Sequence, residues 1–98
     1  MIKNKIQNIE SLLNGEINSN QIIDLIFDSL EELLLKREDV LLNFRNITFI
    51  SVYFLERLED FIERALDLSV KVNITNVQPS VYKVFQVARV ESILGVCC

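Results

Sequence analysis

Residues 40–44, Val-Leu-Leu-Asn-Phe, form a short run that is apolar on both faces and lies between two long helical patterns. Such a run is typical of a central strand that is covered by helices on each side. A strand, a long helix and a second strand then imply a right-handed crossover between parallel neighbours. The pattern therefore predicts an α/β fold, or an α+β fold if the N-terminus adds an antiparallel hairpin.

The two long patterns, residues 20–36 and 52–67, have the spacing of amphipathic helices. Ser19 or Asn20 offers a side-chain oxygen to cap the first helix, and Lys36-Arg37 marks its end. The apolar positions of the first helix are Ile22, Ile26, Leu30, Leu33 and Leu34, widened by Ile23 and Phe27. Those of the second helix are Phe54, Leu55, Leu58, Phe61, Ile62, Ala65 and Leu66. Each set predicts a face that is buried against a common core.

The remaining segments extend this alternation. Residues 69–75 alternate apolar and polar side chains, as a half-exposed strand does. Pro79 suits the first position of a further helix, whose inner face is predicted from Val81, Val84, Phe85 and Ala88. Residues 91–94 can add one turn, and 95–98 form a tail.

Residues 1–18 leave two interpretations open. Ile2, Ile6, Ile9 and Leu13 have helical spacing, whereas the segment can also form a strand or hairpin that ends near Ile17. We prefer the strand or hairpin. Because the chain has only 98 residues and no linker, we expect one domain over residues 1–98.

Composition excludes several functions. The formal net charge is −4, and the basic residues are scattered, which argues against a nucleic-acid partner. Histidine is absent, so histidine-based acid–base catalysis and histidine metal sites are excluded. The carboxylates fall on helix faces that should be wet. We therefore expect no enzyme activity, no cofactor and no metal.

The chain shows no targeting segment and no apolar run long enough to span a bilayer. Its cysteines, Cys97 and Cys98, are adjacent and cannot make a disulfide framework. These features predict a cytoplasmic protein without membrane insertion.

Three stretches together are similar to the STAS (anti-sigma-factor antagonist) family. Residues 15–18, Gly-Glu-Ile-Asn, resemble the G-E-L-D that precedes the first helix of that family. Residues 40–44 and 47–50, Ile-Thr-Phe-Ile, resemble its central strand and its V-T-F-I approach to a regulatory loop. Residues 76–94 resemble its N-V-x-P-x-V-x-x-V-L tail. The resemblance implies a small STAS-like α/β fold with about four strands in a mixed sheet and three to four helices.

The regulatory loop of the family reads D-S-[ST]-G-L-G, and its Ser or Thr is phosphorylated. At residues 51–56 this chain has Ser-Val-Tyr-Phe-Leu-Glu, so that Ser51 replaces the aspartate and Tyr53 falls on the phospho-acceptor. Phe54 and Glu56 replace both glycines, and Asn43 stands where the family usually has an aspartate. These changes are compatible with the fold of the family, but the altered loop does not predict the phosphorylation switch of the family.

Ser51 and Tyr53 are the candidate phospho-acceptors of this loop. A phosphate at a helix N-terminus is electrostatically favoured, but plain N-capping is the preferred role of Ser51. Tyr53 is expected instead on a rim that faces a partner, where an aromatic ring with a polar tip is favoured.

The resemblance implies a regulatory interaction module, whose partner is an anti-sigma kinase or a related scaffold protein. The alternative is a constitutive subunit of a larger complex, such as a stress-signalling scaffold or the accessory protein of a lipid transporter. A homodimer and a small ligand are left open. The residues predicted to contact the partner are Ser51, Val52, Tyr53, Glu56, Glu59 and Asp60.

Overall fold

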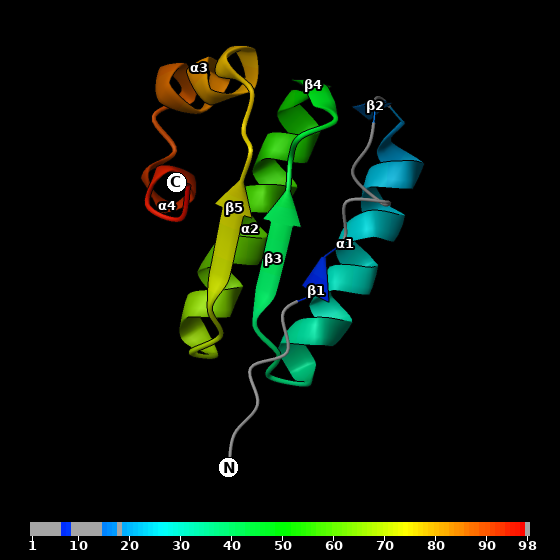
Figure 1. Cartoon of the computed structure of the whole chain (residues 1–98). Helices are drawn as coiled ribbons and strands as arrows, with labels where there is room; N and C mark the ends of the chain where they lie inside the picture. The colour runs from blue at the N-terminus through cyan, green and yellow to red at the C-terminus, as the bar shows by residue number, and fades with distance from the viewer. Residues whose placement is uncertain (1–6, 9–14, 18, 98) are drawn as a thin grey trace.

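Figure 1 shows the computed structural model, which describes residues 7–8, 15–17 and 19–97. The elements follow in the order β1 (Gln7–Asn8), β2 (Gly15–Ile17), α1 (Asn20–Leu35), β3 (Val40–Asn43), β4 (Ile47–Ile50), α2 (Val52–Asp67), β5 (Val72–Thr75), α3 (Pro79–Ala88) and α4 (Glu91–Leu94). Single strands or pairs of strands therefore precede α1, α2 and α3, close to the alternation that the sequence predicts, and the fold is a small α/β fold.

The strands are divided between two small sheets. β1, β3 and β5 form a three-stranded sheet with β3 in the centre, and β2 pairs with β4. Every pairing among the described strands is parallel. The predicted mixed sheet of about four strands is thus not confirmed. The two sheets separate at a tight turn after β3, in which the N–H of Ile47 donates to the carbonyl of Phe44 at 3.0 Å. Beyond this turn β4 pairs with β2 and not with β3.

The N-terminal strands pair with later parts of the chain. β1 lies beside β3 and β2 beside β4, so the described residues hold strands here but no hairpin between these two. The four isoleucine and leucine positions that suggested a helix lie outside the described residues.

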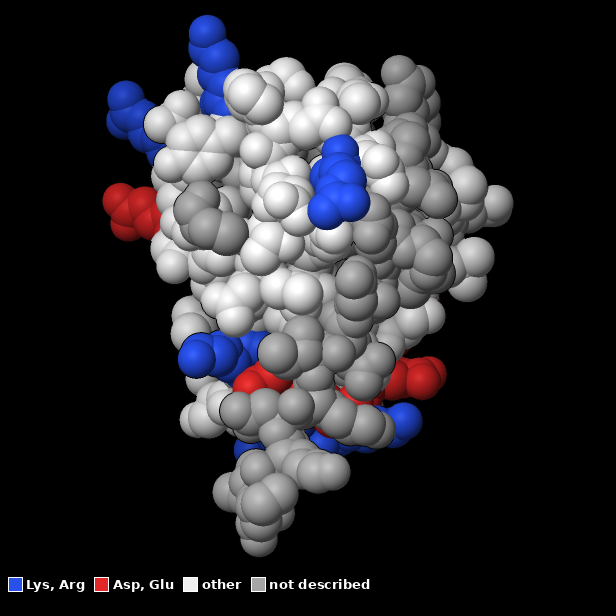
Figure 2. Space-filling model, in the orientation of Figure 1, with Lys and Arg blue, Asp and Glu red and all other residues white. Residues whose placement is uncertain are grey.

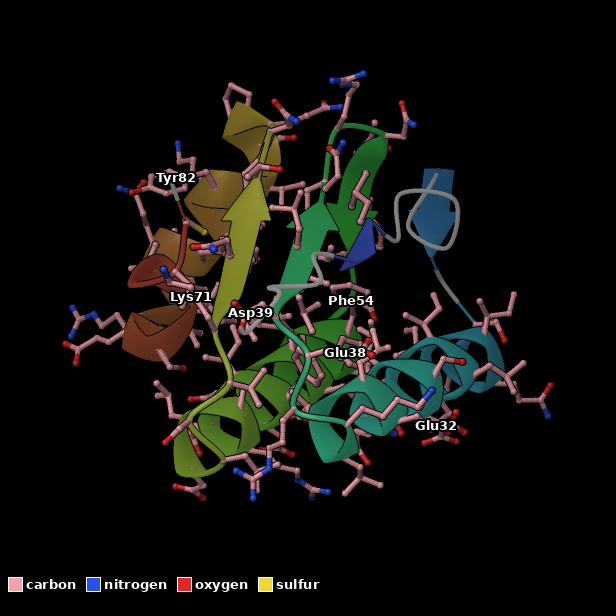
Figure 3. The ribbon with its side chains drawn as sticks, turned by 60° about the horizontal axis from the view of Figure 1, so that its bottom comes forward. Glu32, Glu38, Asp39, Phe54, Lys71 and Tyr82 are labelled. Atoms are coloured by element: carbon pink, nitrogen blue, oxygen red, sulfur yellow. The ribbon has the colours of Figure 1, made fainter. Side chains whose placement is uncertain are left out.

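The central strand is covered differently from the prediction. β3 and β5 are neighbours in parallel register, with Val40 opposite Val72 and Leu42 opposite Ile74. α1 and α2, however, both lie on one face of this sheet (Figures 1 and 3). The chain crosses the sheet in one direction, from β1 to β3 to β5, and successive right-handed crossovers in one direction place their helices on the same face. The expectation of a helix on each face was therefore wrong for α1 and α2, the two helices that flank β3 in the sequence.

The opposite face of the sheet is seen in Figure 2. Most described charged side chains on this face lie toward its upper and lower ends, and most of the described residues seen between them are uncharged. Near the lower end, the N–H of Lys71 donates to the carboxylate of Asp39 at 3.3 Å, which ties the entry of β5 to that of β3 (Figure 3).

The core between sheet and helices is rich in phenylalanine. Phe27 of α1, Phe54 of α2 and Phe44 after β3 are each at most 1% exposed. The ring centroids of Phe27 and Phe54 lie 5.3 Å apart, and those of Phe44 and Phe85 lie 6.3 Å apart. Edge-to-face packing of this kind adds to the free energy that burial of the rings contributes.

The predicted helix faces are correct at their centres and wrong at their margins. Ile22, Leu66 and Val84 were assigned to the core, but their side chains are 52%, 64% and 39% exposed, and Ala88 is exposed as well. Only a stripe of each helix can face the core, so residues at the edges of an apolar pattern reach the surface.

The ends of α1, α2 and α3 are closed without glycine. Arg37, Ser69 and Arg89 follow helices with positive φ angles of 57–59°, a conformation that favours glycine. Arg37 also donates from Nη1 to the carbonyl of Leu68 at 3.0 Å, so the charge at the end of α1 caps the last turn of α2. Among the described residues, no helix combines the length and hydrophobicity needed to cross a lipid bilayer.

Candidate partner-binding site

The first turn of α2 begins at Ser51, directly after β4. Ser51 has extended backbone angles, and its Oγ accepts a hydrogen bond from the N–H of Phe54 at 3.1 Å. This bond satisfies one of the N–H groups that a helix start leaves unpaired. The predicted capping role of Ser51 is therefore confirmed, and α2 begins at Val52 as expected.

Phe54 anchors this turn from the inside. Its side chain is 0% exposed and packs against the rings of Phe27 at 5.3 Å and Phe44 at 6.2 Å (Figure 3). Two positions earlier, the side chain of Val52 is 72% exposed. The start of α2 is thus fixed by the core on one side and presented to solvent on the other.

Tyr53 faces α1 and takes part in a polar network there. Its hydroxyl donates to Oδ1 of Asp24 at 2.6 Å, and Nη1 of Arg57 donates to the same oxygen at 2.6 Å. Arg57 also reaches Asp28 at 3.5 Å, and its guanidinium lies 5.5 Å from the centroid of the Phe27 ring. The network joins the first two turns of α2 to α1.

The charge of Arg57 is stabilised by these contacts. Burial acts to lower the pKa of the guanidinium, but hydrogen bonding with Tyr53 and attraction by Asp24 outweigh it, so that the pKa lies above its ordinary value. The network was not predicted from the sequence, although the wet helix face that was predicted for these acids agrees with Asp28, whose side chain is 70% exposed. The sequence signal for the network is a spacing of four residues in each helix, which places both residues of a pair on one side of the helix. The pairs are Asp24 with Asp28 and Tyr53 with Arg57.

The outer side of α2 carries the predicted acidic residues. Glu56, Asp60 and Glu63 are exposed, and Glu59 is half-buried. Both arginines of α2 turn toward α1, Arg57 to Asp24 and Arg64 to Glu31 at 3.4 Å. Within the described part of the chain, none of these four carboxylates has an ion pair, so the outer side of α2 presents uncompensated negative charge.

An apolar groove of about 500 Å³ adjoins the same turn. One wall is formed by Val52 and Leu55 of α2. The other wall is α3, through Ser80, Lys83, Val84, Val87 and Ala88. In Figure 1, α3 lies at the end of the sheet to which β3 and β5 point. The α3 wall was missed, although the valines on both sides of that helix are a signal that one side faces something other than the core.

Asn43 holds the turn that leads into β4. Its side chain is 7% exposed, and its Oδ1 accepts from the N–H of Arg45 at 3.0 Å and from Nδ2 of Asn76 at 3.1 Å. Gln78 adds a bond from Nε2 to the carbonyl of Arg45 at 2.6 Å. The residue at the family's aspartate position therefore links the end of β3 to the segment after β5.

The described residues contain no group of three or more histidine, cysteine, aspartate or glutamate side chains that could hold a metal ion. Cys97 is half-buried. The candidate site therefore consists of a capped helix start, an acidic helix side and an apolar groove, which are means of contacting another molecule.

Fold and site together define a small α/β domain with a presented helix start. A family model described as the STAS domain matches residues 7–97. The chain therefore belongs to the STAS domain family, as its resemblance in sequence predicted. A search of the curated proteins finds no match.

Proposed function

We propose that this STAS domain is a non-catalytic regulatory module that binds a protein partner through the loop before α2 and the first turns of that helix. The observation that carries the proposal is the contrast between Phe54, which is 0% exposed, and Val52, which is 72% exposed. The contact surface comprises Ser51, Val52, Tyr53, Glu56, Glu59 and Asp60. An anti-sigma kinase or a related scaffold protein is the kind of partner that the family implies.

Electrostatics favours a partner with a basic surface. The side of α2 that faces solvent carries Glu56, Glu59, Asp60 and Glu63, and the arginines of the helix are engaged with α1. Complementary charge raises the rate of association and fixes orientation. Members of the family are generally non-catalytic, and the carboxylates of the site lie at the surface or beside arginine, which supports binding rather than catalysis.

The state of Ser51 decides between a switch and a constitutive contact. A phosphate on Oγ would lie at the N-terminus of α2, where the helix dipole stabilises negative charge. The hydroxyl of Tyr53 is bonded to Asp24 at 2.6 Å, so a phosphate on Tyr53 would place two anions in contact and would have to break this bond.

A constitutive subunit of a larger complex is the second candidate. The hydrogen bond between Tyr53 and Asp24 and the burial of Phe54 favour this role, because both contacts fix the loop as the start of α2. Intact-mass analysis of protein from the native host separates the two roles. One added phosphate at Ser51 supports the switch, and an unmodified mass under all growth conditions supports the constitutive role.

Charge reversal on α2 tests the partner surface. A tagged chain with Glu56→Lys and Asp60→Lys is recovered from the native host beside the unaltered chain, and the co-purifying proteins are identified by mass spectrometry. The control is Glu32→Lys, an exposed change on α1 (Figure 3). We expect the double variant to lose a specific partner that the control retains. Equal recovery from all three chains would show that the outer side of α2 is not the contact surface.

A further inference from the structure

We infer that the groove between α2 and α3 receives an amphipathic helix of the partner protein, with basic residues along the flank that faces α2. This inference rests on the proposed function, because Val52 and Leu55 belong both to the groove and to the presented turn of α2. It adds a second contact surface, α3, and assigns a chemistry to the segment that binds there.

The α3 wall is built from one side of the helix. Ser80, Lys83, Val84, Val87 and Ala88 follow at the spacing i, i+3, i+4, i+7 and i+8, which places them on a single face. Val81 and Phe85, on the other side of α3, already hold the helix against the core. Val87 is nevertheless 73% exposed. Valine gives no advantage in helix propensity, so packing against the core and helix formation do not account for it.

The exposed apolar residues converge instead of being scattered. Val52 and Val87 are more than two-thirds exposed and lie on opposite walls of one groove. Isolated apolar residues at a surface are ordinary, whereas a contiguous apolar patch rimmed by polar groups marks an interaction site.

The lining favours a helix over a small molecule. Ser80 and Lys83 are the polar residues among the seven that line the groove, and the groove is open to solvent. A small-molecule site normally encloses its ligand and orients it with several converging polar groups. An amphipathic helix needs only an apolar channel for side chains at i, i+3 or i+4, and i+7.

The charged residues of α2 beside the groove indicate which side chains the bound helix carries on the flank that faces α2. Glu59 follows Leu55 by four residues, and Glu56 follows Val52 by four, so both acids continue along α2 from the groove wall. Glu63 lies one further turn along the same side. Opposite them, Lys83 supplies a single positive charge in the α3 wall. The carboxylates that continue from the α2 wall outnumber this lysine, and basic side chains on the flank of the bound helix beside α2 complement their charge.

Two synthetic peptides test this inference. Each has about 14 residues, roughly four helical turns, with leucine at the i, i+3 and i+7 positions. One carries lysine on both flanks, and the matched peptide carries glutamate there. Binding is measured by fluorescence anisotropy, and the contacted residues are identified by amide chemical shifts. We expect the lysine peptide to bind, with shifts at residues 52–56 and 80–88, and the glutamate peptide to bind at least about tenfold more weakly.

Variants of the groove sharpen the test. Val87→Asp should weaken binding of the lysine peptide about tenfold or more, whereas Leu25→Asp, at a 67% exposed position on α1, should not change it. Lys83→Glu should strengthen binding of the lysine peptide, a gain that misfolding cannot produce. The inference is overturned if neither peptide saturates below about 1 mM, if both bind equally, or if Leu25→Asp weakens binding as much as Val87→Asp.

Failure here is distinguishable from failure of the proposed function. If charge reversal on α2 abolishes capture of the native partner while neither peptide binds the groove, the module binds its partner without α3. If charge reversal leaves capture of the native partner unchanged, the proposed function itself fails, whether or not the peptides bind.

Discussion

Replacing Phe54 by alanine tests how the start of α2 is held in place. The ring is 0% exposed, and truncating a fully buried phenylalanine costs about 3–5 kcal/mol in the free energy of unfolding. Its edge-to-face contacts with Phe27 and Phe44 favour the upper half of that range, because each such pair adds about 0.5–1.5 kcal/mol. A domain of this size has about 5–15 kcal/mol in total, so the variant should lose a large part of its stability.

Urea unfolding followed by circular dichroism measures this loss. The matched control is Val52→Ala, two positions earlier in the same turn, where the side chain is 72% exposed. It should change the unfolding free energy by no more than about 0.5 kcal/mol. A loss below about 1 kcal/mol for Phe54→Ala, or an equal loss for both variants, would refute the placement of Phe54 in the core.

Three further changes probe single contacts of the site and its helix. Ser51→Ala should lower the unfolding free energy by about 1 kcal/mol through loss of the cap, and Ser51→Asp should restore most of it; equal losses in urea unfolding would exclude capping. Tyr53→Phe should cost about 0.5–1.5 kcal/mol and nearly nothing in an Asp24→Ala background; a double-mutant cycle without coupling would contradict the hydrogen bond. Ser69→Gly should raise the urea midpoint, with a gain of about 0.5–1 kcal/mol from relief of its positive φ; an unchanged midpoint would argue against that backbone conformation.

The local order of the chain was predictable from its sequence because local physics decides it. The boundaries of α2 agree with the prediction, since Ser51 supplies a cap directly before a long apolar stripe. α3 likewise begins at Pro79. α1 begins at Asn20 as predicted, but Ser19 at its N-cap makes no side-chain capping bond, so the predicted cap by Ser19 was wrong. The parallel pairing of β3 with β5 follows from the length of the helix between them.

What could not be predicted depends on how distant segments meet. The bond between Tyr53 and Asp24 joins residues 29 positions apart and requires a particular register between α1 and α2. The groove requires α3 to lie beside the first turn of α2, which no periodicity specifies. Val84 and Ala88 were assigned to the core face of α3 together with Val81 and Phe85, because a valine that lines a groove and a valine in the core look alike in sequence.

The central claim is that the outer side of the first turn of α2 contacts a partner. A photo-crosslinking amino acid placed at Val52 in the native host tests it directly, with Leu35 as the control at the far end of α1, where the side chain is 77% exposed. We expect position 52 to give one identified crosslinked protein that position 35 does not give. Crosslinking of the same protein only from position 35, or from neither position, would contradict the account.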